Sequence, residues 1–210
     1  MPNKKKNELF ARLCGTWCFA SAPYGLLIIG VLLSYSNVYN NEFLFDDLVL
    51  ITGNSYLASW HNIGTLFVTH LGQASGLKDP FYRPLQTLIY LSVYQLAGLS
   101  TVAFHAVNVA LHVLNACLLY TLGVKLEFNR TVSLLAALLW ALHPVHTEAV
   151  TYMSGTADPL CAVFVLTGIL TLATGFSRRR VSGACLLFWM ALMSKEGAIV
   201  FPLLAMGLLF

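Results

Sequence analysis

The chain carries too few charged residues to cover a water-soluble body of its size. Only 10% of its 210 residues are charged and 58% are hydrophobic, whereas soluble domains have about 25% charged residues. This composition excludes soluble enzymes and disordered tails, and a net charge of +3 is too small for a surface that follows nucleic-acid phosphates. The apolar runs are long and do not alternate, which predicts helical spans. We therefore expect an all-α membrane protein, a polytopic helical bundle with at most about six or seven crossings.

The N-terminus predicts the first crossing and its direction. A basic segment, residues 1–12, precedes an apolar run at 13–35. A cleaved secretory signal is the alternative, because residues 20–22 resemble a cleavage site, but the hydrophobic part of such a signal has only about 7–15 residues. We expect residues 1–12 in the cytosol, followed by an uncleaved transmembrane helix at 13–39.

The other basic residues favour one topology over another. If every apolar run crossed the bilayer, the basic turns at 125–130 and 178–180 would lie outside, against the preference of Lys and Arg for the cytosol. If the short run 84–98 instead lies at the interface or re-enters, nine of the twelve basic residues lie inside: Lys4, Lys5, Lys6, Arg12, Lys125, Arg130, Arg178, Arg179 and Arg180. We expect this topology, with an outer loop at 40–101 and the remaining bundle at 102–210. It places the following residues on one outer face: Asp46, Asp47, Arg83, His143, His146 and Asp158.

Two adjacent carboxylates follow the first span. Ionisable residues near a bilayer are costly, so each is a candidate for function. Asp46 and Asp47 point in different directions on either a helix or a strand, so we do not expect them to share a proton. One could act as a general base or bind a metal while the other caps the helix that follows. A solvated acidic loop is the alternative.

A polar stripe marks the apolar run at 102–122. Its four members are spaced at i, i+3, i+7 and i+10 and therefore share one helical face: His105, Asn108, His112 and Asn115. Asn and His commonly hydrogen-bond between helices in membrane bundles. The stripe predicts either such bonds or the lining of a polar cavity.

The segment His143-Pro144-Val145-His146-Thr147-Glu148 cuts another apolar run short. Pro144 disfavours a helical conformation at His143, and broken helices at membrane depth line a cavity or are buried in protein. A zinc site from His143, His146 and Glu148 is possible. However, the spacing His-Glu-x-x-His is absent, and the proline between the histidines spoils a common helical face. We therefore expect no metal and no other cofactor.

Two neighbouring charges, Lys195 and Glu196, lie between two short apolar runs near the end of the chain. They could neutralise each other as an ion pair. Alternatively, Lys195 could bind an anionic ligand, and the residues alone do not choose between the two.

Seven motifs in chain order resemble a known set of membrane enzymes. They are Phe45-Asp46-Asp47, Tyr82-Arg83-Pro84-Leu85, Phe104-His105-Ala106-Val107-Asn108, His112-Val113-Leu114-Asn115, Leu142-His143-Pro144-Val145-His146-Thr147-Glu148-Ala149-Val150, Ser154-Gly155-Thr156-Ala157-Asp158 and Ser194-Lys195-Glu196. Together they resemble the membrane half of the transmembrane and tetratricopeptide-repeat-containing O-mannosyltransferases and their bacterial relatives. These are GT-C glycosyltransferases, and the resemblance runs from about residue 40 to residue 210.

The resemblance implies a GT-C type bundle whose first outer loop carries an interfacial helix and a catalytic acid, here Asp46 or Asp47. The interfacial helix agrees with the placement of 84–98 from charge. The resemblance also implies a polyprenyl- or dolichyl-phosphate sugar donor and a Ser or Thr hydroxyl of a protein as acceptor. The lipid phosphate and sugar would then meet the charged and polar residues of the outer face: Arg83, His143, His146, Glu148, Asp158 and Lys195.

Arg83 is the first candidate to stabilise the leaving phosphate, because a cation there offsets the charge that develops. Lys195 is the second, and His143 or His146 could donate hydrogen bonds. The implied location is an endoplasmic reticulum membrane or a bacterial inner membrane, with the N-terminus cytosolic.

The sequence departs from the family pattern in two places. Members usually follow the acid pair with an Asn-x-Asp element, but residues 52–56 read Thr-Gly-Asn-Ser-Tyr and lack the second acid. The chain also stops at Phe210 within an apolar run, which predicts a truncated chain. Two alternative functions remain: a transporter or flippase-like protein, and a non-catalytic membrane anchor for tetratricopeptide repeats.

Overall fold

The structure, a computed structural model, describes residues 21–76 and 81–208. All regular elements in these residues are helical, which confirms the predicted all-α class. The predicted segment 1–12 and the start of the predicted helix 13–39 lie outside them. Three segments are long and apolar enough to cross a membrane: Ser21–Asn40, α4 (Thr101–Lys125) and Met153–Ala173, which joins η7 (Met153–Thr156) to α7 (Ala157–Ala173).

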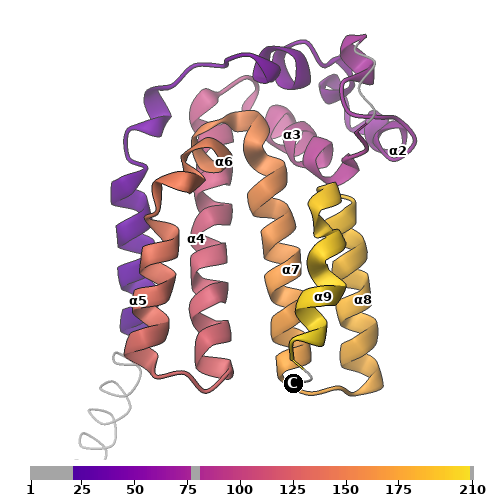
Figure 1. Cartoon of the computed structure of the whole chain (residues 1–210). Coiled ribbons are helices and arrows are strands. Elements are labelled where there is room, and N and C mark those ends of the chain that lie inside the picture. Colours follow the sequence, from indigo (N-terminus) through magenta and orange to yellow (C-terminus); the bar gives the residue numbers. More distant parts are fainter. Residues whose placement is uncertain (1–20, 77–80, 209–210) are drawn as a thin grey trace, which may run out of the picture.

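Three shorter helices run beside these segments. α5 (Arg130–Ala141) lies along α4 (Figure 1). Two helices lie along α7: α8 (Arg178–Leu192) and α9 (Phe201–Met206). A short helix, η8 (Glu196–Val200), precedes α9. Each is shorter than the about 20 residues of a full crossing. In the described part of the chain, therefore, only three of the expected crossings reach full length.

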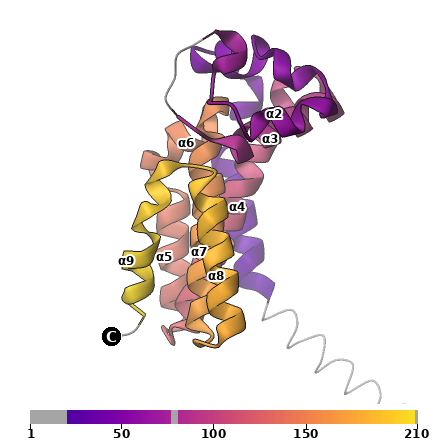
Figure 2. The ribbon, with the colours of Figure 1, turned by 90° about the vertical axis from the view of Figure 1, so that its right-hand side faces the viewer.

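The predicted outer loop folds into short helices that lie across one end of the bundle (Figures 1 and 2). The run at 84–98 forms α3 (Pro84–Ala97), which packs against α4 and the loop helices instead of running along the bundle. Its position at the interface stays a prediction. The loop helices are η1 (Val38–Asn40), η2 (Leu48–Thr52), η3 (Ser55–Ala58), η4 (Trp60–Asn62), α2 (Ile63–Leu66) and η5 (Gln73–Ser75).

Charge separates along the bundle axis as the sequence predicts. The turn between α4 and α5, which carries Lys125 and Arg130, and the turn before α8, which carries Arg178, lie at the end opposite the loop (Figure 1). Asp46 and Asp158 lie at the loop end, where both border one cavity.

Three apolar clusters hold these parts together. The first joins Ser21–Asn40 to α4 and α5, the second joins α3 to the loop helices, and the third joins α7, α8 and α9. In the third cluster Gly168 allows a close approach, because a Cβ there would come within 2.6 Å of the Phe201 ring. The second cluster also includes Phe104 of α4 and Met153 of η7, so it packs the loop onto the end of the bundle.

Local sequence signals set the helix ends that matter for the site. Pro84 occupies the first turn of α3, where a missing backbone donor costs nothing. α5 ends at Ala141, and His143 is extended, as expected for the residue before a proline. The chain then turns through η6 (Pro144–His146) into the short helix α6 (Thr147–Thr151). This break lets α6 close over the end of the bundle between α5 and α7.

Candidate functional site

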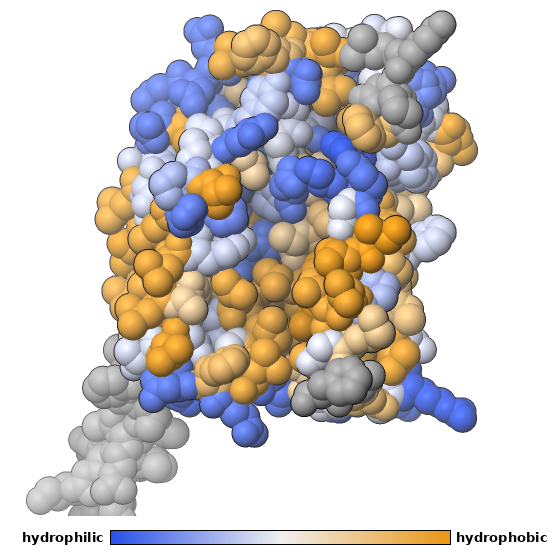
Figure 3. Space-filling model, in the orientation of Figure 1, coloured by the Kyte–Doolittle hydropathy of each residue, from blue (hydrophilic) through white to orange (hydrophobic). Residues whose placement is uncertain are grey.

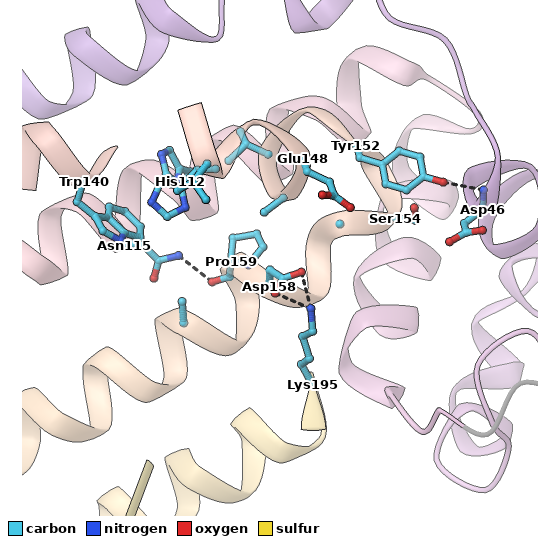
Figure 4. A pocket seen from close by; sticks show the side chains of 16 residues that line it. Asp46, His112, Asn115, Trp140, Glu148, Tyr152, Ser154, Asp158, Pro159 and Lys195 are labelled. Atoms are coloured by element: carbon cyan, nitrogen blue, oxygen red, sulfur yellow. Dashed lines mark hydrogen bonds and ion pairs between the residues drawn. The ribbon is translucent and has the colours of Figure 1, made fainter. Parts of the chain in front are cut away.

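A cavity of 560 Å³ opens at the loop end, between α4, α5, α6 and α7 (Figure 4). On this face of the molecule, hydrophilic side chains gather in the upper part and hydrophobic ones below (Figure 3). The cavity brings together seven residues that the sequence singled out: Asp46, His112, Asn115, His146, Glu148, Asp158 and Lys195. They come from segments spread over 150 residues of chain, so only the fold unites them.

The two adjacent aspartates have opposite environments. Asp46 is exposed at the cavity, and within the described residues its carboxylate makes no hydrogen bond or ion pair. Its backbone N–H donates to the Tyr152 hydroxyl oxygen at 2.8 Å. Asp47 is 1% exposed and does not line the cavity. The expectation that the two carboxylates point apart is therefore confirmed.

Asp47 ties the outer loop to the bundle. One carboxylate oxygen accepts from the Ser154 N–H at 2.7 Å, and the other accepts from the Leu44 N–H at 3.1 Å. Burial raises the pKa of the Asp47 carboxyl above its ordinary value, while these two N–H donors oppose the rise. The suggestion that one aspartate caps the next helix is wrong, because Asp47 precedes η2 without a capping bond from its side chain.

The polar stripe of α4 forms the expected hydrogen bonds between segments. All four residues are at most 2% exposed. Each side chain lies within hydrogen-bond distance, 2.8–3.3 Å, of a backbone carbonyl oxygen in another segment. The pairs are His105 with Asn41, Asn108 with Tyr152, His112 with Ala141, and Asn115 with Pro159. Most of these carbonyls lie at helix ends or breaks, where intrahelical partners are missing. His112 and Asn115 also line the cavity, but His105 and Asn108 do not.

The break after α5 separates its two histidines. The His143 ring nitrogen Nδ1 accepts from the Val145 N–H at 3.1 Å, and the side chain faces a different cavity, between the Ser21–Asn40 segment and α6. His143 therefore does not line the cavity that contains His146, because the turn at Pro144 directs it to the other side of α6. His146 lines the main cavity, and burial lowers the pKa of its ring.

An aromatic wall that the sequence did not single out closes one end of the cavity. The ring of Trp140 lies 4.4 Å from that of His146 and stacks on that of His112 at 5.0 Å, between ring centroids. Figure 4 shows Trp140, His112 and Asn115 at one end of the cavity and Asp46 at the other. The only signal in the sequence was an aromatic residue in the last turn before a helix break.

Lys195 and Glu196 do not pair with each other. Lys195 Nζ donates to both carboxylate oxygens of Asp158, at 2.6 and 2.7 Å. Glu196 instead accepts two bonds from the Arg83 guanidinium, at 2.7 and 3.1 Å. The mutual ion pair is therefore wrong, because the turn before η8 directs the two side chains to α7 and to the start of α3.

Arg83 lies beside the main cavity, not in it. Its side chain is 14% exposed and lines a neighbouring cavity of 140 Å³. Asp46 and Ser154 line both cavities. The candidate base therefore stands between the cavity that contains Lys195 and the one that contains Arg83.

The site offers more negative than positive charge. Asp46, Glu148 and Asp158 line the main cavity with one lysine, Lys195, which Asp158 already neutralises. Among the described residues no group of three His, Cys, Asp or Glu side chains could hold a metal ion. The arrangement can take up a proton at Asp46 and accept hydrogen bonds from a ligand rich in hydroxyl groups.

Comparison with known proteins identifies relatives of the chain. It is 34% identical to protein O-mannosyl-transferase TMTC4 of Homo sapiens over 193 residues, which cover 82% of the chain and 26% of that protein. The chain is a distant homologue of the TMTC protein O-mannosyl-transferases. TMTC1 of Homo sapiens is 32% identical over 82% of the chain and 20% of its own length, and tmtc2 of Xenopus laevis 34% over 80% and 22%.

The similarity covers the membrane region of these TMTC proteins. The chain therefore spans about a quarter or less of the length of these relatives. No family model matches the chain, and no solved structure does. The resemblance seen in the seven motifs is confirmed as homology to the TMTC proteins.

Proposed function

We propose that the chain is the membrane part of a protein O-mannosyl-transferase. It transfers mannose from a polyprenyl- or dolichyl-phosphate donor to a Ser or Thr hydroxyl at the luminal or periplasmic face of the membrane. Homology to the TMTC proteins supports the reaction class. The observation that carries the proposal is the cavity at the loop end, where the Asp46 carboxylate, unpaired among residues 21–76 and 81–208, faces a polar space beside two cations.

Asp46 is the general base of this reaction. A base must reach the proton that it removes, and Asp46 is exposed in the cavity while Asp47 is buried with both oxygens bonded to backbone N–H groups. The acceptor hydroxyl oxygen attacks the anomeric carbon of the sugar as Asp46 takes its proton. The bond between that carbon and the phosphate oxygen breaks, and the phosphate leaves with the electron pair.

Lys195 and Arg83 stabilise the leaving phosphate. Each cation is held by a carboxylate on a surface-exposed segment, Asp158 or Glu196, whose side chains are 47% and 56% exposed. In both pairs the carboxylate is the more exposed partner, so an anionic ligand that enters the cavities competes with it directly for the cation. The donor phosphate then lies near Asp46, between the two cavities.

The loop end faces the lumen or periplasm in this proposal. The basic turns at the other end of the bundle support it, because Lys and Arg favour the cytosolic side. A lipid donor also suits this position, since its isoprenoid tail can stay among the apolar side chains that lie below the hydrophilic area in Figure 3.

The test is transfer of radiolabelled mannose from polyprenyl-phosphate mannose to a Ser/Thr peptide, with the protein in membrane vesicles. We expect labelled peptide from the wild type and a loss of about 10²–10⁴ in rate for Asp46→Asn. Glu42→Gln is the matched control, since Glu42 is an exposed acid of the same loop outside the cavities described above. Label that crosses the vesicle without entering peptide would indicate transport instead, and equal transfer by Asp46→Asn would disprove the base.

A further inference from the structure

The end of the cavity opposite Asp46 has a composition that the proposed proton transfer does not use. Two aromatic rings, those of Trp140 and His146, form its wall. Asn115 lies at the same end of the cavity as Trp140 (Figure 4). Aromatic faces beside hydrogen-bond acceptors suit the faces and hydroxyl groups of a sugar ring, which present C–H groups and O–H donors respectively.

Asn115 supplies an acceptor whose orientation is already set. Its amide nitrogen donates to the Pro159 carbonyl at 2.8 Å, so its oxygen Oδ1 is oriented by this bond. The side chain is fully buried, yet Oδ1 has no hydrogen-bond partner in the part of the chain that the structure describes. An unpaired buried acceptor costs about 1–3 kcal/mol, and a ligand hydroxyl that donates to it would recover part of this cost.

Charge favours a neutral ligand at this end. Glu148 and Asp158 border the middle of the cavity, and Lys195 is bound to Asp158. Burial lowers the pKa of His146, which keeps its ring neutral at pH 7. A phosphate at the aromatic end would therefore lie away from Lys195 and Arg83. The carboxylates of Glu148 and Asp158 would be nearer to it than Arg83. Carboxylates accept hydrogen bonds from sugar hydroxyls well.

We propose that Trp140, His146 and Asn115 form a subsite for the neutral hexose ring of the donor, with Glu148 as a further hydroxyl acceptor. The proposal rests on the function proposed above and adds an orientation to it. The ring packs against the Trp140 and His146 side chains, and one hydroxyl donates to Asn115 Oδ1. The anomeric carbon and its phosphate then point toward Lys195 and Asp46.

The experiment compares two phosphodiester probes of equal charge, methyl-phosphoryl-farnesol and mannosyl-phosphoryl-farnesol, because a phosphomonoester would carry a second ionisation with a pKa of about 6. Binding to the purified protein in nanodiscs is followed by calorimetry, and the ratio of the two dissociation constants reports what the hexose contributes. We expect the wild type to bind the mannosyl probe more tightly. Asn115→Ala should reduce this preference about fivefold to tenfold, through a lost hydrogen bond, and Trp140→Ala about threefold to tenfold.

Asn108→Ala is the matched control for folding. Asn108 lies on the same stripe of α4 and donates to the Tyr152 carbonyl at 2.9 Å, but its oxygen is already bonded to Thr156 and it does not line the cavity. We expect it to leave the preference for the mannosyl probe unchanged. An equal loss of preference in both asparagine variants would overturn the subsite, because it would indicate a general packing effect.

Two further outcomes separate this proposal from the proposed function. If the wild type binds both probes equally well, the hexose subsite is wrong while binding of a lipid phosphate stands. If the wild type binds neither probe, the proposed function fails and the subsite fails with it.

Discussion

Replacing Asp47 by alanine should destabilise the fold by about 2–4 kcal/mol. Asp47 is 1% exposed, and its carboxylate joins the outer loop to the turn between α6 and α7 through the Ser154 N–H at 2.7 Å. Without this acceptor the Ser154 N–H is left unpaired in a buried position, which costs about 1–3 kcal/mol, and a bond to a charged acceptor is lost as well. The second donor, the N–H of Leu44, belongs to a 53% exposed residue, so water can replace its bond at little cost.

Asp47→Asn should cost far less than Asp47→Ala. The amide keeps one oxygen that can accept from Ser154, and it removes a charge whose ionisation burial disfavours. We expect a loss of about 1 kcal/mol or less. Asp46→Ala is the matched control, because Asp46 is exposed and its carboxylate makes no bond within the described residues. It should leave the melting temperature unchanged.

The pH dependence of the same variants tests the raised pKa of Asp47. Because the folded pKa lies above the unfolded value of about 3.9, the protonated form contributes stability that is complete below that value and is lost as pH rises through the folded pKa. The wild type should therefore lose stability relative to Asp47→Asn as pH increases from about 4. A difference in melting temperature that does not change with pH would contradict this reasoning.

The assay is thermal unfolding in detergent micelles, in which each kcal/mol shifts the midpoint by about 2–4 °C for a chain of this size. The explanation would be refuted if Asp47→Ala and Asp46→Ala melted at the same temperature. It would also be refuted if Asp46→Ala kept full transfer activity while the stably folded Asp47→Asn lost it, because the roles of the two carboxylates would then be reversed.

The remaining predictions concern the neighbours of the cavity. Arg83→Ala should reduce transfer by about 10²–10³ without unfolding the bundle, whereas Glu196→Gln, which only frees the guanidinium, should have a much smaller effect; comparable losses in both would show that the ion pair itself matters. His143→Ala should lower the melting point by removing the bond to the Val145 N–H, a loss of about 0.5–2 kcal/mol, and should keep most activity. His146→Ala should raise KM for the lipid donor, and a larger effect of His143→Ala on KM would place the donor on the other side of α6.

Much of the architecture could be predicted because it follows from short-range rules. Long apolar runs between basic turns marked the helices, and the run at 84–98 was set apart by its length and by the charges around it. The spacing of the stripe from His105 to Asn115 predicted a shared face because helical periodicity is local. The turn at Pro144 was predictable for the same reason, since a proline restricts the residue before it.

The partners of individual side chains could not be predicted in this way. Lys195 and Glu196 are adjacent in sequence, and mutual neutralisation was a reasonable expectation, yet each contacts an element more than 30 residues away. His143 and His146 belong to one motif and face two different cavities. The backbone conformation of one turn sets the direction of each of these side chains, and the spacing of residues in a motif does not specify that conformation.

The sequence by itself determined the class of the protein, its helices and the end of the bundle at which its polar residues gather. Charge scarcity and helical periodicity suffice for this, because they depend on the transfer of each segment into lipid and on local backbone geometry. Only the tertiary structure distinguishes the environments of Asp46 and Asp47. Their sequence environment is nearly the same, but folding buries one against the Ser154 N–H and leaves the other facing the cavity. Burial and long-range contacts set the chemistry of a carboxylate, and both arise only when segments distant in the chain pack together.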